Sequence, residues 1–266
     1  MKNKTLILQV QYCFYVLLIF VLSNCNTREI PPAQQKKAVL DTVKTTKKLV
    51  ITLDTTILSY VVNLQEQQLK FYWKDETGSL FSNIGKLKKE LENKGEQLVF
   101  ATNGGMFSPT HEPVGLYIEN GKTIYPINTV KDAYGNFYLQ PNGIFYIQND
   151  KKAVVVATKD FEHDTTIQYA TQSGPMLVID GKIHSKFNTT SEHTNIRNGV
   201  GILPNGNVLL AMSKQPITLY DFATYFKQEG CENALYLDGA ISQTYLPSQD
   251  WMQTGGNFGV LIAVIK

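Results

Sequence analysis

Short clusters of glycines and polar side chains carry the groups in this sequence that are suited to chemistry. The first follows the apolar run 97–101, which predicts a buried strand, and places Asn103, Gly104 and Gly105 at its end. Two adjacent glycines let main chain approach a ligand closely and leave amide groups free to donate to it. The alternative is a simple turn, which Asn-Gly often forms.

Two further clusters also stand where strands end. Ser173 and Gly174, followed by a proline, interrupt what would otherwise be one long strand. Asp238 follows the apolar run 234–237 and precedes Gly239 and Ser242. A partly buried aspartate can have a tuned pKa, as a general acid, a general base or a hydroxyl-binding group requires. The alternative for Asp238-Gly239 is a hairpin turn, but the residues beyond do not alternate like a returning strand.

Arg197 is the only arginine after residue 48 and is followed by Asn198. Lysine serves elsewhere as the surface cation, so a solitary arginine suggests that its planar fork is used on a phosphate or carboxylate. A structural ion pair with an aspartate is the alternative.

Several familiar chemistries are absent. The sequence has no G-x-S-x-G, no GxxxxGK[ST] and no H-E-x-x-H. No two of its four histidines are spaced to share a helix face, which argues against a histidine metal site. Cys231 lies next to Glu232 and is expected to be a packing thiol. No cofactor is indicated, and a divalent-cation requirement stays open.

The surrounding pattern predicts the elements that position these clusters. Asn-Gly and Asp-Gly turns at 119–122, 180–181 and 205–206 predict hairpins. Apolar residues at helical spacing predict a helix within 79–95, and a second helix begins at Thr218, with Asp221 in a capping-box position. Many strands and only two helices predict an α+β fold: a single domain of mixed, largely antiparallel β-sheets flanked by a few helices. A pure sandwich is the rival, and the helices count against it.

The first 25 residues predict export. Lys2 and Lys4 precede a short apolar run, 12–22, that is typical of a signal peptide and too short to span a membrane. Leu-Ser-Asn-Cys at 22–25 resembles the lipobox of bacterial lipoproteins, with Asn24 where a small residue is usual, and predicts lipidation of Cys25. The alternatives are an uncleaved signal anchor and an ordinary secreted protein. Residues 26–48 predict a flexible tether, and residues 49–266 the folded domain.

The charge distribution excludes nucleic acid as a partner. Of 25 basic and 23 acidic residues, 8 and 2 lie in residues 1–48, which leaves 17 basic and 21 acidic residues in the remainder. Phosphate binding along a nucleic acid needs a basic face, and only the tether is basic. The tether is suited to lie near anionic lipid.

Taken in order, the clusters resemble the phosphodiester glycosidase family from about residue 52 to 266. The marks are Asn-Gly-Gly-Met-Phe, Pro-Val-Gly-Leu-Tyr, Ser-Gly-Pro-Met-Leu-Val, Arg-Asn-Gly-Val-Gly and Leu-Asp-Gly, at 103–107, 113–117, 173–178, 197–201 and 237–239. One departure is that Ala240 and Ile241 stand where characterised members usually have two glycines.

The resemblance implies hydrolysis of a sugar-1-phosphodiester or related glycosidic bond in envelope or environmental glycans. It implies that Arg197 binds the anion, that Asn103 and the amides of Gly104 and Gly105 hold substrate oxygens, and that Asp238 is the leading carboxylate. Lining residues of the same cleft would be Ser173, Gly174, Asn198 and Ser242. Most glycosidases use two carboxylates, and Glu112 is the candidate for the second.

The sequence therefore predicts an exported lipoprotein, anchored to the bacterial envelope through Cys25, whose partner is a glycan or sugar-phosphate substrate. The alternative is a non-catalytic glycan-binding surface lipoprotein that keeps the cleft without turnover.

Overall fold

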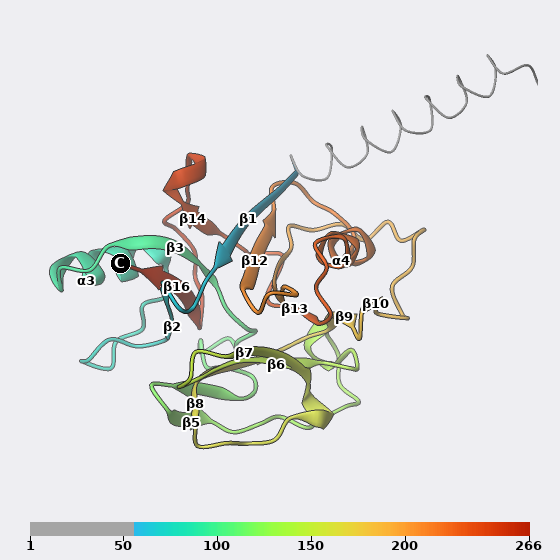
Figure 1. The fold of residues 1–266 in the computed structure, drawn as a ribbon, viewed down its shortest axis with the longest axis horizontal. Helices are drawn as coiled ribbons and strands as arrows, with labels where there is room; N and C mark the ends of the chain where they lie inside the picture. The colour runs from blue at the N-terminus through green and yellow to red at the C-terminus, as the bar shows by residue number, and fades with distance from the viewer. Residues whose placement is uncertain (1–55) are drawn as a thin grey trace, which may run out of the picture. The chain divides into compact units, whose positions relative to one another are not determined.

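The computed structural model describes residues 56–266, which form three β-sheets and two α-helices (Figure 1). The signal peptide and tether predicted for residues 1–48, including Cys25, lie outside the described residues. None of the helices within 56–266 is long and apolar enough to cross a membrane.

Sheets A and B combine strands that are distant in sequence, whereas the strands of sheet C follow one another in the chain. Sheet A has the order β1 (Ile57–Val62), β12 (Val208–Ser213), β11 (Asn198–Ile202), β13 (Ala234–Tyr236), β9 (Met176–Ile179) and β10 (Lys182–Ile183). Sheet B has the order β15 (Trp251–Met252), β14 (Thr244–Leu246), β3 (Leu98–Asn103), β16 (Leu261–Ile265) and β2 (Gln68–Tyr72). Sheet C has the order β5 (Lys122–Tyr125), β4 (Tyr117–Glu119), β8 (Ile167–Ser173), β6 (Gly143–Gln148) and β7 (Ala153–Ala157).

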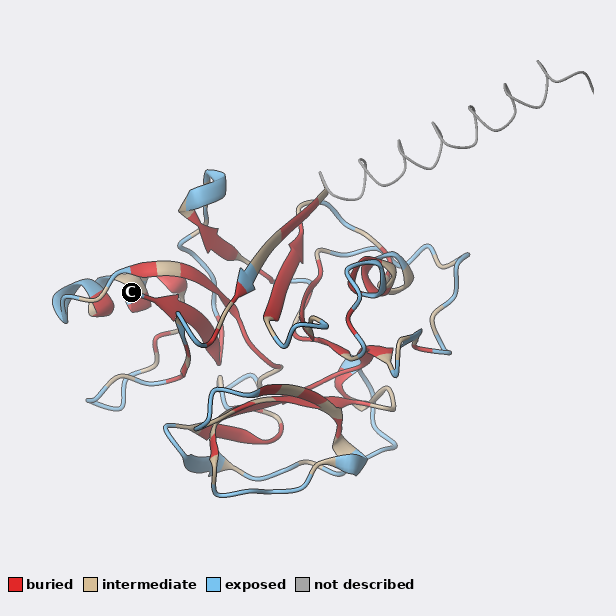
Figure 2. Ribbon diagram, viewed as in Figure 1, coloured by how far each residue is buried: buried red, intermediate tan, exposed pale blue. Residues whose placement is uncertain are grey.

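The largest hydrophobic core is shared by all three sheets. It joins Phe71 of β2, Phe145 of β6 and Leu235 of β13, each at most 1% exposed. Figure 2 shows the strands of the sheets mostly buried or partly buried, with exposed residues mainly in the connections. Because burial of apolar surface is the dominant favourable term in folding, this common core fixes the sheets against one another.

One helix covers each of two outer sheet faces. α4 (Leu219–Gln228) packs Phe222 and Phe226 against sheet A, and α3 (Ile84–Asn93) packs Ile84 and Leu87 against sheet B. Both N-termini are capped by side chains, as Asn83 accepts from the Lys86 amide and Thr218 accepts from the Asp221 amide. The three short 3₁₀ turns are Asn136–Tyr138, Thr158–Asp160 and Pro247–Gln249.

The α+β prediction is confirmed in its main features. The two predicted helices are present, and Thr218 makes the expected hydrogen bond with Asp221. All strand pairings within 56–266 are antiparallel, so the sheets contain none of the parallel pairs that the word mixed allowed. The β4–β5 and β9–β10 hairpins turn at the predicted positions, and both central residues of each turn have a positive φ. At 205–206 only Gly206 has a positive φ, because that turn is longer.

Two of the predicted clusters are places where the chain changes sheet. β8 of sheet C ends at Ser173 and β9 of sheet A begins at Met176, so the Ser-Gly-Pro segment separates two sheets. The Asp238-Gly239 segment joins β13 of sheet A to β14 of sheet B, and is therefore not a hairpin turn. The clusters meet because these crossings occur next to the end of β3.

Candidate active site at the junction of the three sheets

Asn198 links the strand ends of sheets A and B. It is fully buried at the start of β11, and its Nδ2 donates to the Asn103 carbonyl at 2.8 Å and to the Thr102 hydroxyl at 3.2 Å. Its Oδ1 accepts from the Asp238 amide at 2.9 Å. One side-chain amide therefore uses its donor and acceptor groups to hold β3 against the segment that carries Asp238.

Asn103 holds the other side of the same segment. Its Nδ2 donates to the Asp238 carbonyl at 2.9 Å, and its Oδ1 accepts from the Gln243 amide at 3.2 Å. The Ser242 hydroxyl also donates to the Asp238 carbonyl, at 2.5 Å. Both main-chain polar groups of Asp238 are thus occupied, which fixes where its side chain begins.

Ser173 brings sheet C into the same network. Its hydroxyl is fully buried and donates to the Leu237 carbonyl at 2.7 Å. The Leu237 amide in turn donates to the Asn198 carbonyl at 3.0 Å. The structure therefore brings Asn103, Ser173, Asn198, Asp238 and Ser242 together, and we call these five residues the junction network.

Among residues 56–266, the Asp238 carboxyl group is the one side-chain group of the junction network without a hydrogen-bond partner. Nothing within residues 56–266 hydrogen-bonds to its carboxyl oxygens, while the residue is partly buried. Burial disfavours the charged form and raises the pKa of Asp238 from an ordinary 3.8 to about 6. A carboxyl group with this pKa can hold a proton in weakly acidic solution and release it to a bound ligand.

Arg197 is buried next to the network with its nitrogens already paired. Nε donates to the Ile217 carbonyl at 3.1 Å, Nη2 to the His193 carbonyl at 3.0 Å and Nη1 to the Tyr236 hydroxyl at 3.2 Å. None of the ion pairs within 56–266 involves Arg197, so the aspartate pair expected from the structural alternative is absent. The guanidinium charge stays without a carboxylate partner, and its hydrogen bonds brace the 193–197 segment.

Tyr236 is a site component that the sequence did not reveal. Burial raises the pKa of its phenol, and the nearby Arg197 charge opposes that rise. A Cβ at Gly239 would lie 1.7 Å from the Tyr236 hydroxyl oxygen, so this ring requires glycine directly after Asp238. The sequence signal for Tyr236 is its position in the apolar run 234–237, and that pattern is equally typical of any core tyrosine.

The predicted glycines owe their presence to close packing. The Gly104 amide donates to the Val260 carbonyl at 2.8 Å, so the expectation that it is free for a substrate oxygen is wrong. A Cβ at Gly105 would lie 2.5 Å from the Thr171 hydroxyl oxygen, and one at Gly174 would lie 2.6 Å from the Asn142 Cβ. These contacts leave no room for a side chain where the three sheets meet.

Glu112 stands apart from the junction network. It is exposed in the loop between β3 and β4, where its carboxylate accepts from the Thr110 hydroxyl at 3.3 Å. A hydrogen bond with the same carboxylate contributes to the raised pKa of Tyr125, after the effect of burial. Within residues 56–266, no hydrogen bond joins Glu112 to any of the five network residues.

Comparison with known proteins identifies the family. The model of the phosphodiester glycosidase family matches residues 96–258, which include the whole junction network. The uncharacterised Escherichia coli K12 protein YigE is 38% identical over 192 residues, which cover 72% of this chain and 74% of YigE. The chain therefore belongs to the phosphodiester glycosidase family, as the order of its motifs predicted.

Solved structures resemble the fold at low sequence identity. A Burkholderia pseudomallei protein aligns with a TM-score of 0.51 at 10% identity, over 78% of this chain and 73% of its own. The zebrafish N-acetylglucosamine-1-phosphodiester alpha-N-acetylglucosaminidase catalytic domain, auto-inhibited by its pro-peptide, aligns with a TM-score of 0.49 at 16% identity, over 79% of this chain and 88% of its own. The likeness to the Burkholderia pseudomallei protein concerns the fold alone, because the two sequences are only 10% identical.

Proposed function

We propose that this chain hydrolyses the glycosidic bond of sugar-1-phosphodiesters and that Asp238 is its proton donor. The observation that carries the proposal concerns Asp238. Hydrogen bonds fix its main chain, its carboxyl oxygens have no hydrogen-bond partner among residues 56–266, and burial raises its pKa to about 6. Family membership supplies the reaction class. The network supplies the positioned acid that such a reaction uses.

The proposed reaction breaks the bond between the sugar C1 and the bridging phosphate oxygen. Water attacks C1 and loses a proton, while Asp238 gives its proton to the departing phosphate monoester. The second pKa of a phosphate monoester is about 6, which matches that of Asp238. Proton transfer between groups of similar pKa near the working pH is favourable for general acid catalysis. Glu112 remains the proposed second carboxylate, as the group that takes the proton from water.

The pH dependence follows from the direction of the Asp238 shift. Because the acid form is required, kcat/KM for a sugar-1-phosphodiester should be highest below pH 6. Above pH 6, where Asp238 loses its proton, it should fall by about tenfold per pH unit. Sugar release measured at constant ionic strength between pH 4 and 9 (about the range that brackets both forms) tests this. A rate that rises through pH 6 would show that Asp238 acts as a base or nucleophile instead.

The second candidate is a glycan-binding protein without turnover. Ile241 is 46% exposed three residues after Asp238, at a position where the family resemblance implies glycine. This departure from the family motif, together with Ala240, favours a cleft that binds a sugar without turnover. Binding of a sugar-1-phosphodiester by the full chain, without sugar release in the presence of varied divalent ions, would establish this function and overturn the first.

We further propose that the chain is exported and lipidated at Cys25, as its sequence predicts. In cells of a bacterium that processes lipoproteins, the chain should partition into the membrane fraction and incorporate labelled palmitate. Cys25→Ser should lose the label and move to the soluble exported fraction, because one thiol carries the anchor. Equal labelling of Cys25→Ser and the unmodified chain would refute this assignment.

A further inference from the structure

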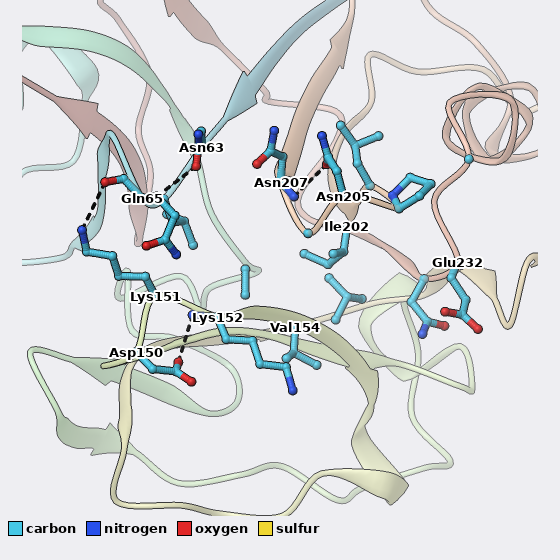
Figure 3. A pocket seen from close by; sticks show the side chains of 18 residues that line it. Asn63, Gln65, Asp150, Lys151, Lys152, Val154, Ile202, Asn205, Asn207 and Glu232 are labelled. Atoms are coloured by element: carbon cyan, nitrogen blue, oxygen red, sulfur yellow. Dashed lines mark hydrogen bonds between the residues drawn. The ribbon is translucent and has the colours of Figure 1, made fainter.

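None of the five junction-network residues lines a cavity of about 770 Å³. Figure 3 shows the residues that line this cavity. Its walls are the turns that follow β1, join β6 to β7 and join β11 to β12, together with Gly230, Glu232 and Asn233. Ile202 lines it at the end of β11, whereas Asn198 of the network stands at the start of that strand. Four strand residues span about 13 Å, so the cavity is a separate site, and its size is within the range of about 300–1,000 Å³ for ligand pockets.

The cavity walls are braced by hydrogen bonds within and between the turns. Lys151 Nζ donates to the Gln65 carbonyl at 3.3 Å and so ties two of the turns together. Inside the turns, Asn63 Oδ1 accepts from the Gln65 amide at 3.0 Å and Asn205 Oδ1 accepts from the Asn207 amide at 3.0 Å. A ligand would therefore enter a cavity that is already formed, which lowers the entropic cost of binding.

These same hydrogen bonds leave the cavity rich in donors. The side-chain oxygens of Asn63, Asn205 and Asn233 accept from main-chain amides, and among residues 56–266 no acceptor pairs with their NH₂ groups. The side-chain amides of Gln65 and Asn207 have no partner within the described residues either. Figure 3 shows Asn63 and Gln65 on one side of the cavity and Asn205 and Asn207 on another. The complementary ligand presents many oxygen acceptors.

The floor and the charges narrow the ligand class. Leu64, Val155 and Ile202 make an aliphatic floor, and the residues lining the cavity include no aromatic ring on which a nucleobase could stack. The charged lining residues are two of each sign: Lys151, Lys152, Asp150 and Glu232. Balanced charge gives no preference for a strongly anionic ligand.

We infer that this cavity is a second binding site that takes a neutral oligosaccharide, with sugar hydroxyls on the side-chain amides and a sugar C–H face on the aliphatic floor. Sugar hydroxyls both accept and donate, which suits a wall of amides with free NH₂ groups. The site holds glycan independently of whether Asp238 cleaves it, and so goes beyond the proposed function.

Ligand-observed saturation-transfer NMR on the full chain tests the inference. The probes are maltotetraose, cellotetraose and chitotetraose, each offered separately to the unmodified protein and to variants. At least one probe should show transfer. Asn207→Ala should weaken that probe's binding about fivefold or more, as the loss of one hydrogen-bonding amide predicts. Gln65→Trp, which changes an exposed side chain and fills the cavity, should abolish it.

Two control variants and a competition with inorganic phosphate make the outcome decisive. Asn149→Ala removes an exposed amide outside the lining residues and should leave binding unchanged. Asp238→Asn should also keep the signal, which separates this site from the junction network. Absence of transfer from all three probes, loss of transfer in Asp238→Asn with retention in Gln65→Trp, or displacement by equimolar inorganic phosphate would each overturn the inference.

Discussion

Asp238→Asn should lower kcat for a sugar-1-phosphodiester by about 100- to 10,000-fold, the usual contribution of a positioned general acid. The amide cannot deliver a proton, yet it has nearly the same shape as the carboxyl group that it replaces. The main-chain bonds of Asp238 to Asn103 and Asn198 persist in the variant because neither uses the side chain. The effect should therefore fall on kcat, and KM should change little. Steady-state sugar release at pH 5.5 (about half a unit below the Asp238 pKa) measures both constants.

The same substitution should raise the stability of the fold at alkaline pH. The pKa of Asp238 is higher in the folded chain than in the unfolded chain, so its favourable contribution is present at low pH and is lost as pH rises through 6. Asparagine stays neutral, so Asp238→Asn should gain up to about 3 kcal/mol over the unmodified chain at pH 8 and nothing at pH 3.5. Urea unfolding at both pH values checks the stability prediction. For the catalytic prediction, a kcat of Asp238→Asn within about threefold of that of the unmodified chain would remove Asp238 from the chemistry.

Asn198→Ala should cost about 2–5 kcal/mol of the free energy of unfolding, which is large for one polar side chain. The change leaves the Asp238 amide, the Asn103 carbonyl and the Thr102 hydroxyl without the partner that each has now. Those groups are buried where three sheets meet, so water cannot readily replace the lost amide. Thermal and urea unfolding at pH 5.5 (about the assay pH above) provide the measurement.

Asn195→Ala is the matched control for that change. Asn195 is exposed, and its backbone bonds to Ile217 do not involve its side chain. Its removal should stay within about 0.5 kcal/mol of the unmodified chain. Similar losses for the two variants would mean that Asn198 does not brace the junction as its contacts indicate.

The elements were predictable from sequence because their signals are local. Apolar runs and Asn-Gly or Asp-Gly turns mark the strands and hairpins, and the spacing of Ile84, Leu87 and Leu91 marks α3 on one face. Thr218 and Asp221 mark the start of α4 for the same reason, since the capping contact spans three residues. These patterns do not say which strands pair, and so left the three-sheet arrangement open.

The partners within the site were not predictable because they are far apart in the chain. The bonds from Asn103 to Asp238 and from Asn198 to Asn103 span 135 and 95 residues. Motif order located these residues, but it assigned them to substrate where the structure shows them holding main chain. The role of Tyr236 was missed on the same ground, because its hydrogen bond with Arg197 joins residues that are 39 positions apart.

The most direct test of the proposed reaction follows oxygen from solvent into product. The full chain is incubated with a sugar-1-phosphodiester in water enriched in ¹⁸O. The masses of the phosphate monoester and of the sugar are then measured by mass spectrometry. Cleavage between C1 and oxygen, with Asp238 as the acid, predicts ¹⁸O on the sugar and none in the phosphate, with both products formed about 100- to 10,000-fold more slowly by Asp238→Asn. Incorporation of ¹⁸O into the phosphate monoester, or equal product from Asp238→Asn, would contradict it.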